Sequence, residues 1–166
     1  MKSGNRKSVR RPGHDYAGPA IYFVTLCTDN RACLFGQVIQ GEMYLNDLGR
    51  IVHEEWIRSP QIRTELDLDR WIVMPDHFHG IVHIRPKTTF KGFVGAAGGR
   101  PALHTGSLGS FIGGFKSITT KRINEKRGTP GGPVWQRNYD EHIIDTNIEL
   151  QRIRQYIKDN PRNWKS

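Results

Sequence analysis

The fold is decided by one stretch of the chain, Trp71-Ile-Val-Met-Pro-Asp-His-Phe-His-Gly-Ile-Val82. Its β-branched and aromatic residues predict two strands, 66–74 and 77–84, that pair as antiparallel neighbours. Side chains two apart in a strand point to the same side of the sheet. His77 and His79 therefore share one face, and two neutral imidazoles on one rigid face form half of a divalent-metal site.

The remaining residues predict an α+β domain around these two strands. Apolar patterns predict further strands at 21–28 and 31–35, helices at 46–58 and 107–126, an irregular or extended segment at 134–144, and a last helix that begins at the capping box of Thr146 and Glu149. Because strands and helices follow one another in this order, we expect a ferredoxin-like antiparallel sheet with helices on one face.

The 166 residues are enough for one domain with a substantial core. We expect this domain to span 19–166 and to follow a basic, flexible arm at 1–18. The segment 85–106 is rich in Gly, Pro and Lys and has no periodicity, which predicts a mobile loop within the domain.

Other features exclude a membrane protein and a secreted, disulfide-rich protein. No stretch approaches the length of a membrane-spanning helix, so no membrane partner is expected. The polar, basic N-terminus does not have the pattern of a secretory signal. Cys27 and Cys33 do not form a CxxC pair, and no disulfide framework is expected. These features predict a cytoplasmic protein.

The charge of the chain indicates a nucleic-acid partner. It has 25 Lys and Arg against 16 Asp and Glu, which gives a formal net charge of +9 at pH 7. Such an excess is typical of proteins that bind DNA or RNA, although a solvated surface is the alternative for each basic cluster. The candidate DNA contacts are Lys116, Lys121, Arg122, Arg137 and Arg152.

The last helix carries two further candidate site residues. Tyr156 and Asn160 are four residues apart, so they lie on one face of that helix. This face borders the apolar stripe of Leu150, Ile153 and Ile157, at the boundary between core and solvent. A tyrosine in that position could serve as an oxygen nucleophile, and an asparagine oxygen could complete a metal site.

Two blocks of the sequence resemble a known family. The run His77-Phe78-His79 is similar to the HUH motif (His, bulky apolar residue, His) of single-tyrosine transposases. Segments 135–144, Trp-Gln-Arg-Asn-Tyr-Asp-Glu-His-Ile-Ile, and 156–161, Tyr-Ile-Lys-Asp-Asn-Pro, resemble the C-terminal signature of REP-associated tyrosine transposases. The blocks follow the family's order, and the resemblance extends over most of the chain. Asp140 stands where the family has a second aromatic residue, and Asp145 where it has an arginine.

The resemblance implies an HUH nuclease fold and a bacterial, nucleoid-associated enzyme that cleaves and rejoins single-stranded DNA at hairpin-bearing sites. It implies that His77 and His79 bind Mg²⁺ or Mn²⁺, that Asn160 is a third ligand, and that Tyr156 forms a covalent 5′-phosphotyrosine intermediate. The residue types suit this chemistry, because a hard divalent ion neutralises phosphate charge. A phenolate is also a moderate leaving group, which allows the strand to be rejoined.

Several alternatives stay open at this level. Tyr139 is a rival nucleophile, or it packs in the core or stacks on a base. Glu141 and His142 could support the metal ligands or only the fold, and His83 is structural or faces DNA. A replication-initiator-like nickase uses the same histidine pair but needs room for a helicase domain. The main alternative function is a catalytically inactive or domesticated protein that binds single-stranded nucleic acid. The recognised hairpin, the choice between Mg²⁺ and Mn²⁺, and a monomeric or homodimeric state are not readable from the sequence.

Overall fold

The computed structural model describes residues 11–15, 18–85 and 106–165. Its strands are β1 (Ala20–Cys27), β2 (Gly36–Ile39), β3 (Glu42–Leu45), β4 (Leu66–Val73), β5 (His77–Ile84) and β6 (Asp140–Ile143). Its helices are α1 (Asp47–Ile62), α2 (Leu108–Arg127) and α3 (Asn147–Asp159), with 3-10 turns η1 (Asp29–Arg31) and η2 (Asn160–Asn163). Four strands form an antiparallel sheet in the order β4-β5-β1-β6, and β2 and β3 form a separate hairpin.

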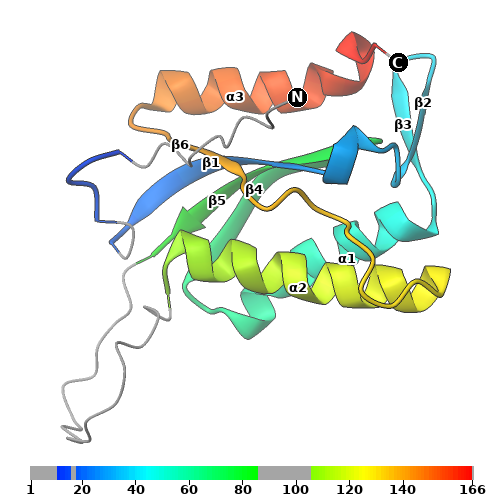
Figure 1. The fold of residues 1–166 in the computed structure, drawn as a ribbon. Coiled ribbons are helices and arrows are strands. Elements are labelled where there is room, and N and C mark those ends of the chain that lie inside the picture. Colours follow the sequence, from blue (N-terminus) through cyan, green and yellow to red (C-terminus); the bar gives the residue numbers. More distant parts are fainter. Residues whose placement is uncertain (1–10, 16–17, 86–105, 166) are drawn as a thin grey trace, which may run out of the picture.

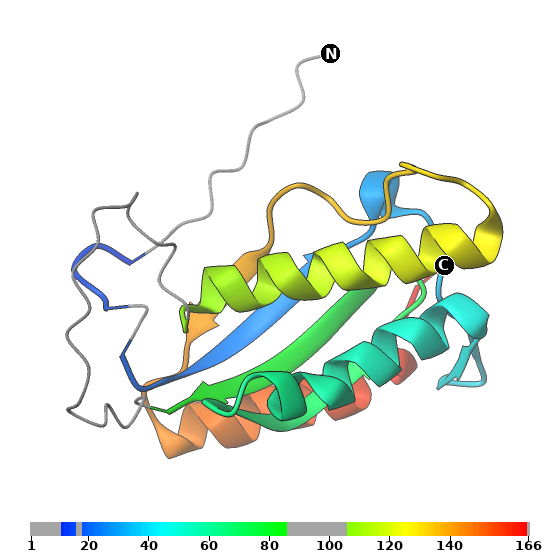
Figure 2. The same ribbon diagram turned by 90° about the horizontal axis from the view of Figure 1, so that it is seen from below.

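The succession β1-α1-β4-β5-α2-β6 is that of a ferredoxin-like unit, so the predicted α+β fold is confirmed. Helices α1 and α2 lie side by side on one face of the sheet, as predicted (Figures 1 and 2). The last helix, α3, covers the opposite face, so the prediction that the helices share one face was wrong for α3. A sheet covered on both faces must be apolar on both, and β5 is buried along almost its whole length.

Each face of the sheet has its own core. The larger core lies under α1 and α2, where the ring of Trp56 packs 4.5 Å from that of Phe78 and 5.3 Å from that of Phe111. The smaller core lies under α3 and contains Ile81 and Ile157. Because neighbouring residues of β5 alternate between these two cores, the register of the central strand is fixed, and with it the direction of every histidine on β5.

Two parts of the secondary structure differ from the prediction. The segment expected as a strand at 31–35 is not a strand, and the β2–β3 hairpin follows it instead. Helix α1 does not end before Pro60 but continues to Ile62. A proline removes only one backbone donor, and the last turn of α1 closes through the bond from Arg63 N to Ser59 O at 2.9 Å.

The remaining predictions concern the N-terminal arm, the loop at 85–106, the two cysteines and membrane-spanning helices. Most of the predicted arm at 1–18 and of the predicted loop at 85–106 lies outside the described residues, so both stay predictions. Cys27 and Cys33 are free thiols, as expected. Among the helices of the described segments, none has the length and apolar character needed to cross a membrane.

An ion pair joins α3 to the edge strand β4. Arg154 donates from Nε to Asp69 Oδ1 over 2.9 Å, and His83 Nε2 lies 3.1 Å from Asp69 Oδ2. The hydrogen bond from Arg154 lowers the pKa of Asp69 to about 2, and the bond to His83 acts in the same direction. The carboxylate is therefore more stable ionised in the folded protein than in the unfolded chain.

We predict that Asp69→Asn lowers the free energy of unfolding at neutral pH by about 1 kcal/mol. The pKa shift alone implies more, but solvent screens the partly exposed guanidinium of Arg154. Because the pKa is depressed on folding, the contribution of Asp69 is complete above about pH 4 and is lost as the pH falls through about 2. Urea unfolding at neutral and acidic pH measures the difference. Asp67→Asn, two residues along the same strand, is the matched control: it removes a solvent-exposed ion pair with Arg85 and should have a smaller effect. An Asp69→Asn effect that is independent of pH would contradict the assignment.

Candidate active site on the face covered by α3

The two histidines of β5 lie where the sequence predicts them, on one face of the sheet. His77 and His79 are 7% and 5% exposed, and the centroids of their rings are 4.6 Å apart. The register of the sheet places Cys27 opposite His77 and Thr25 opposite His79 on the neighbouring strand β1. Both rings therefore lie within the sheet's central pair of strands, with little freedom to move.

Each imidazole is oriented by a hydrogen bond at Nδ1. His77 Nδ1 donates to Asp76 Oδ1 over 2.6 Å, and His79 Nδ1 lies 2.8 Å from Thr25 Oγ1. Asp76 is itself held by Arg31, whose Nε is 2.9 Å from Asp76 Oδ2. These bonds leave Nε2 of each ring for a ligand, and a histidine backed by a carboxylate is typical of metal sites.

Helix α3 brings the other two predicted residues to the histidines. Asn160 follows the last residue of α3, and its Oδ1 lies 3.2 Å from His77 Nε2. The ring centroid of Tyr156 is 5.4 Å from that of His79 and 6.1 Å from that of Phe23. Tyr156 is 50% exposed, so its hydroxyl-bearing ring is open to a ligand in solvent while one side contacts His79.

The electrostatics of His79 suit a metal ligand. Burial, together with smaller electrostatic effects of the neighbouring His77 and Arg31, lowers the pKa of His79 to about 3. The imidazole is therefore neutral at physiological pH. A neutral imidazole has a lone pair available, which metal binding requires.

The donor atoms fit a small divalent ion. His77 Nε2 and Asn160 Oδ1 lie 3.2 Å apart, so both could contact one bound ion when the imidazole is neutral and carries its proton on Nδ1. Neighbouring ligands of an octahedral Mg²⁺ are about 3 Å apart. A cation bound by both atoms would replace the hydrogen bond that otherwise joins them. In the part of the chain that the structure covers, no three His, Cys, Asp or Glu side chains gather as a metal site, so the set would depend on the amide oxygen of Asn160.

The chain has a relative in Haemophilus influenzae (strain Rd KW20). The two sequences are 34% identical over 164 residues, which cover 96% of this chain and 90% of the relative, an uncharacterized protein. This chain belongs to the same family as that protein. A scan against models of known protein families found no match.

Solved structures identify the fold. The structure of a REP-associated tyrosine transposase bound to a REP hairpin matches with a TM-score of 0.59 and 17% identity, over 95% of this chain and 76% of that one. The protein thus has the fold of a REP-associated tyrosine transposase, and the predicted resemblance is confirmed for the fold. A candidate transposase from Deinococcus radiodurans matches with a TM-score of 0.47 and 18% identity, over 90% of this chain and 97% of that one.

Within this transposase fold, the rival nucleophile lies in a different environment. Tyr139 packs against the core under α1 and α2, and the ammonium group of Lys116 lies 5.4 Å from the centroid of its ring. The sheet therefore separates Tyr139 from His77 and His79. The geometry favours Tyr156 as the tyrosine that belongs with the histidine pair.

The remaining open residues near the C-terminal signature have structural contacts. His142 Nε2 lies 2.6 Å from Glu149 Oε1, which ties β6 to the first turn of α3. The carboxylate oxygens of Glu141 are buried, and within the described segments no hydrogen-bond partner reaches them. Among the described residues, neither side chain has a hydrogen bond or ring contact with His77 or His79, and the bond from His142 to Glu149 favours a fold-supporting role for His142.

The candidate DNA contacts are spread over the molecule. Lys116 donates to the main-chain oxygens of Gln136 and Asn138, and Arg122 pairs with Glu54 and Glu55, so both charges already have partners on α2's face of the sheet. The other three side chains, which are exposed, are Lys121, Arg137 and Arg152. Their contacts with DNA stay predictions.

The sequence analysis missed several residues that complete the site. Asp76 and Thr25 orient the two imidazoles, and the ring of Phe23 stacks on His79 with centroids 5.2 Å apart. The ring centroid of Trp164 lies 5.8 Å from that of His77. Asp76 could have been found, since a carboxylate directly before the first histidine can reach it. Thr25 and Phe23 could not, because their positions depend on the pairing of β1 with β5.

Proposed function

We propose that this protein is a metal-dependent DNA transposase that cleaves and rejoins single-stranded DNA at hairpin-bearing sites through a covalent 5′-phosphotyrosine intermediate. One observation carries the proposal. The half-exposed ring of Tyr156 lies beside His79, on the same helix that presents Asn160 to His77. A nucleophile and a set of metal donors thus share one small region of the surface.

The proposed reaction assigns a task to each of these side chains. Tyr156 Oη attacks the scissile phosphorus, a P–Oη bond forms, and the P–O3′ bond breaks with a proton taken up by the released 3′-hydroxyl. Rejoining is the reverse displacement, in which a 3′-hydroxyl attacks the phosphotyrosine and the phenol leaves. His77, His79 and Asn160 would hold Mg²⁺ or Mn²⁺, which supplies charge neutralisation at the phosphate. Asp76 and Thr25 keep the two imidazoles oriented for this purpose.

The choice of substrate rests on the fold relative and on charge. The transposase of the same fold was solved with a REP hairpin bound, which supports a DNA hairpin as the partner. The net charge of +9 favours a polyanionic partner. We propose that the protein acts on DNA in the cytoplasm.

The test is a search for a covalent adduct. A library of labelled single-stranded hairpins with randomised flanks is incubated with the protein and Mg²⁺ or Mn²⁺, and then separated on a denaturing protein gel. We expect label to stay on the protein only when a divalent ion is present and not in EDTA. Binding of the hairpins without any adduct, with either ion, would instead favour a catalytically inactive nucleic-acid-binding protein.

We predict that Asp76→Asn weakens Mn²⁺ binding by about 10-fold to 100-fold, because an amide is a poorer acceptor for His77 Nδ1 than a carboxylate. Calorimetric titration with Mn²⁺ measures the affinity, and thermal unfolding checks that the variant folds. Asp159→Asn is the matched control. Asp159 directly precedes Asn160, and its carboxylate accepts a hydrogen bond from Gln155 instead of orienting a histidine. Equal Mn²⁺ affinities for Asp76→Asn and the parent protein would refute the orienting role.

A further inference from the structure

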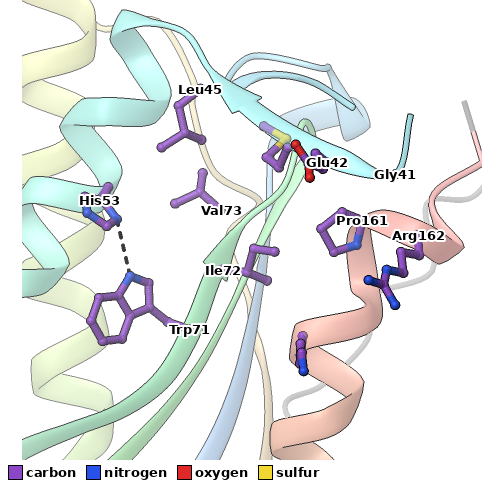
Figure 3. A pocket seen from close by; sticks show the side chains of 11 residues that line it. Gly41, Glu42, Leu45, His53, Trp71, Ile72, Val73, Pro161 and Arg162 are labelled. Carbon is purple, nitrogen blue, oxygen red and sulfur yellow. Dashed lines mark hydrogen bonds between the residues drawn. The ribbon is translucent and has the colours of Figure 1, made fainter. Parts of the chain in front are cut away.

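A groove runs along the free edge of β4, away from Tyr156. The sheet ends at β4, and a cavity of about 620 Å³ lies between that strand, α1, the β2–β3 hairpin and the end of α3 (Figure 3). A second cavity of about 640 Å³ continues along the strand, and Trp71 lines both. We call these two cavities the β4 groove. The side chains that define it for the argument below are His53, Arg70, Trp71, Lys158 and Arg162.

Helix α3 has two different flanks beside its buried stripe. Tyr156 lies on one flank, against Phe23 and His79. Lys158 and, one turn further, Arg162 of η2 line the β4 groove on the other flank. The α3 wall of the groove is therefore continuous with the candidate active site, since Pro161 and Arg162 directly follow Asn160.

The groove has uncompensated positive charge. Within the described residues, Lys158, Arg162 and Arg70 make no ion pair. Of the carboxylates in the groove, Asp69 is paired with Arg154, whereas Glu42 keeps its negative charge, because its partner is the neutral Tyr44 hydroxyl at 3.3 Å. The cations of the lining still outnumber its carboxylates, so the groove favours an anion.

The groove also has an anchored aromatic ring. Trp71 is half-buried, and its Nε1 donates to His53 Nδ1 over 3.4 Å, so the indole is tied to α1 at its polar edge (Figure 3). Trp71 lines the two cavities and also packs against the larger core. An aromatic ring between unpaired cations is the arrangement that binds single-stranded nucleic acids, because bases stack on the ring while phosphates contact the cations.

We propose that the β4 groove binds the single strand that leads away from the cut site, with an unpaired base on Trp71 and phosphates on Lys158 and Arg162. The inference rests on the proposed function, and it adds a second binding surface to it. The groove is close to the histidines, since Ile72 in its wall pairs with His79 across neighbouring strands about 4.8 Å apart. A peptide added to the free edge of β4 is the competing occupant, but its neutral backbone would not need the cations of the groove for binding.

The test measures binding of a short oligothymidylate to the full chain in EDTA, so that neither a metal nor a covalent step takes part. Lys158→Gln and Arg162→Gln are each expected to reduce the slope of log affinity against log salt concentration by about 0.7, the value for one lost phosphate contact on a single strand. Trp71→Ala should weaken binding about tenfold, whereas Trp71→Phe, which keeps an aromatic ring, should retain most of it.

Controls separate this inference from simpler explanations. Lys126→Gln removes one positive charge from α2, where Lys126 pairs with Asp47 and does not line the groove, and should leave the salt slope unchanged. Thermal unfolding identifies a Trp71→Ala variant that fails to fold, and the two cation variants then decide the question. Equal salt slopes for Lys158→Gln, Arg162→Gln and the parent protein would overturn the proposal. They would instead favour a peptide as the occupant of the β4 edge.

The outcome is also independent of the covalent chemistry. Groove variants that lose oligothymidylate, in a protein that never forms an adduct, support the groove and reject the transposase proposal. Adduct formation in a protein whose groove variants bind normally rejects the groove alone.

Discussion

Tyr156→Phe is expected to abolish covalent attachment to single-stranded DNA and to leave DNA binding nearly unchanged. The substitution removes only the hydroxyl oxygen that would bond to phosphorus, and the ring keeps its contacts with Phe23 and His79. Because Tyr156 is 50% exposed, losing its hydroxyl leaves no buried partner unsatisfied, and the fold should be unaffected. The measurement is the yield of protein-linked label on a denaturing gel, with affinity determined separately in EDTA.

Two other tyrosines provide matched controls. Tyr44 is also about half exposed, at 52%, and lies on the β2–β3 hairpin, so Tyr44→Phe should form adduct normally. Tyr139→Phe tests the rival nucleophile, which lies on the opposite side of the sheet. If Tyr156→Phe formed adduct in unchanged yield and Tyr139→Phe formed none, Tyr139 would be the nucleophile.

His77→Ala should lose divalent-metal binding and DNA cleavage together. The change removes a donor atom and leaves the carboxylate of Asp76 and the oxygen of Asn160 without their shared partner. We expect Mn²⁺ affinity to fall by more than about 100-fold, since loss of a supporting group alone costs 10-fold to 100-fold. Calorimetric titration and the metal dependence of the cleavage rate measure the two effects.

A second histidine on the same strand and face serves as the control. His83 lies 3.1 Å from Asp69 and is part of the contact between β4 and α3. His83→Gln should therefore alter stability but not metal affinity. If His77→Ala still cut DNA in a normal metal-dependent way, His77 would not be a metal ligand.

The sequence was sufficient for the β4–β5 pair, because the two faces of β5 have different side chains and cannot be exchanged. A shift of one residue in β5 would move His77 and His79 into the core of Trp56 and Phe78, so the period-two pattern permits one register only. The β2–β3 hairpin was missed for a local reason. Its strands have four residues each, and its path depends on positive φ angles at Gly36 and Gly41, which carry no apolar pattern.

The positions of the candidate site residues on their own strand and helix were predictable, but the way these elements assemble was not. The spacing of Tyr156 and Asn160 places them on one flank of the last helix, and the structure has them there. Amphipathicity shows which side of a helix is buried, but not which face of the sheet it covers. The β4 groove illustrates the same limit, since its walls come from a hairpin, two helices and an edge strand that are far apart in the sequence.

The most direct test is mass spectrometry of the peptide that stays linked to DNA after the protein is incubated with a cleavable hairpin and Mg²⁺ or Mn²⁺, then digested with trypsin and nuclease. We predict a residual nucleotide phosphate on the α3 peptide that contains Tyr156. A nucleotide on any other tyrosine, or cleavage of the hairpin with no linked peptide at all, would contradict the assignment of Tyr156 as the nucleophile beside the paired histidines.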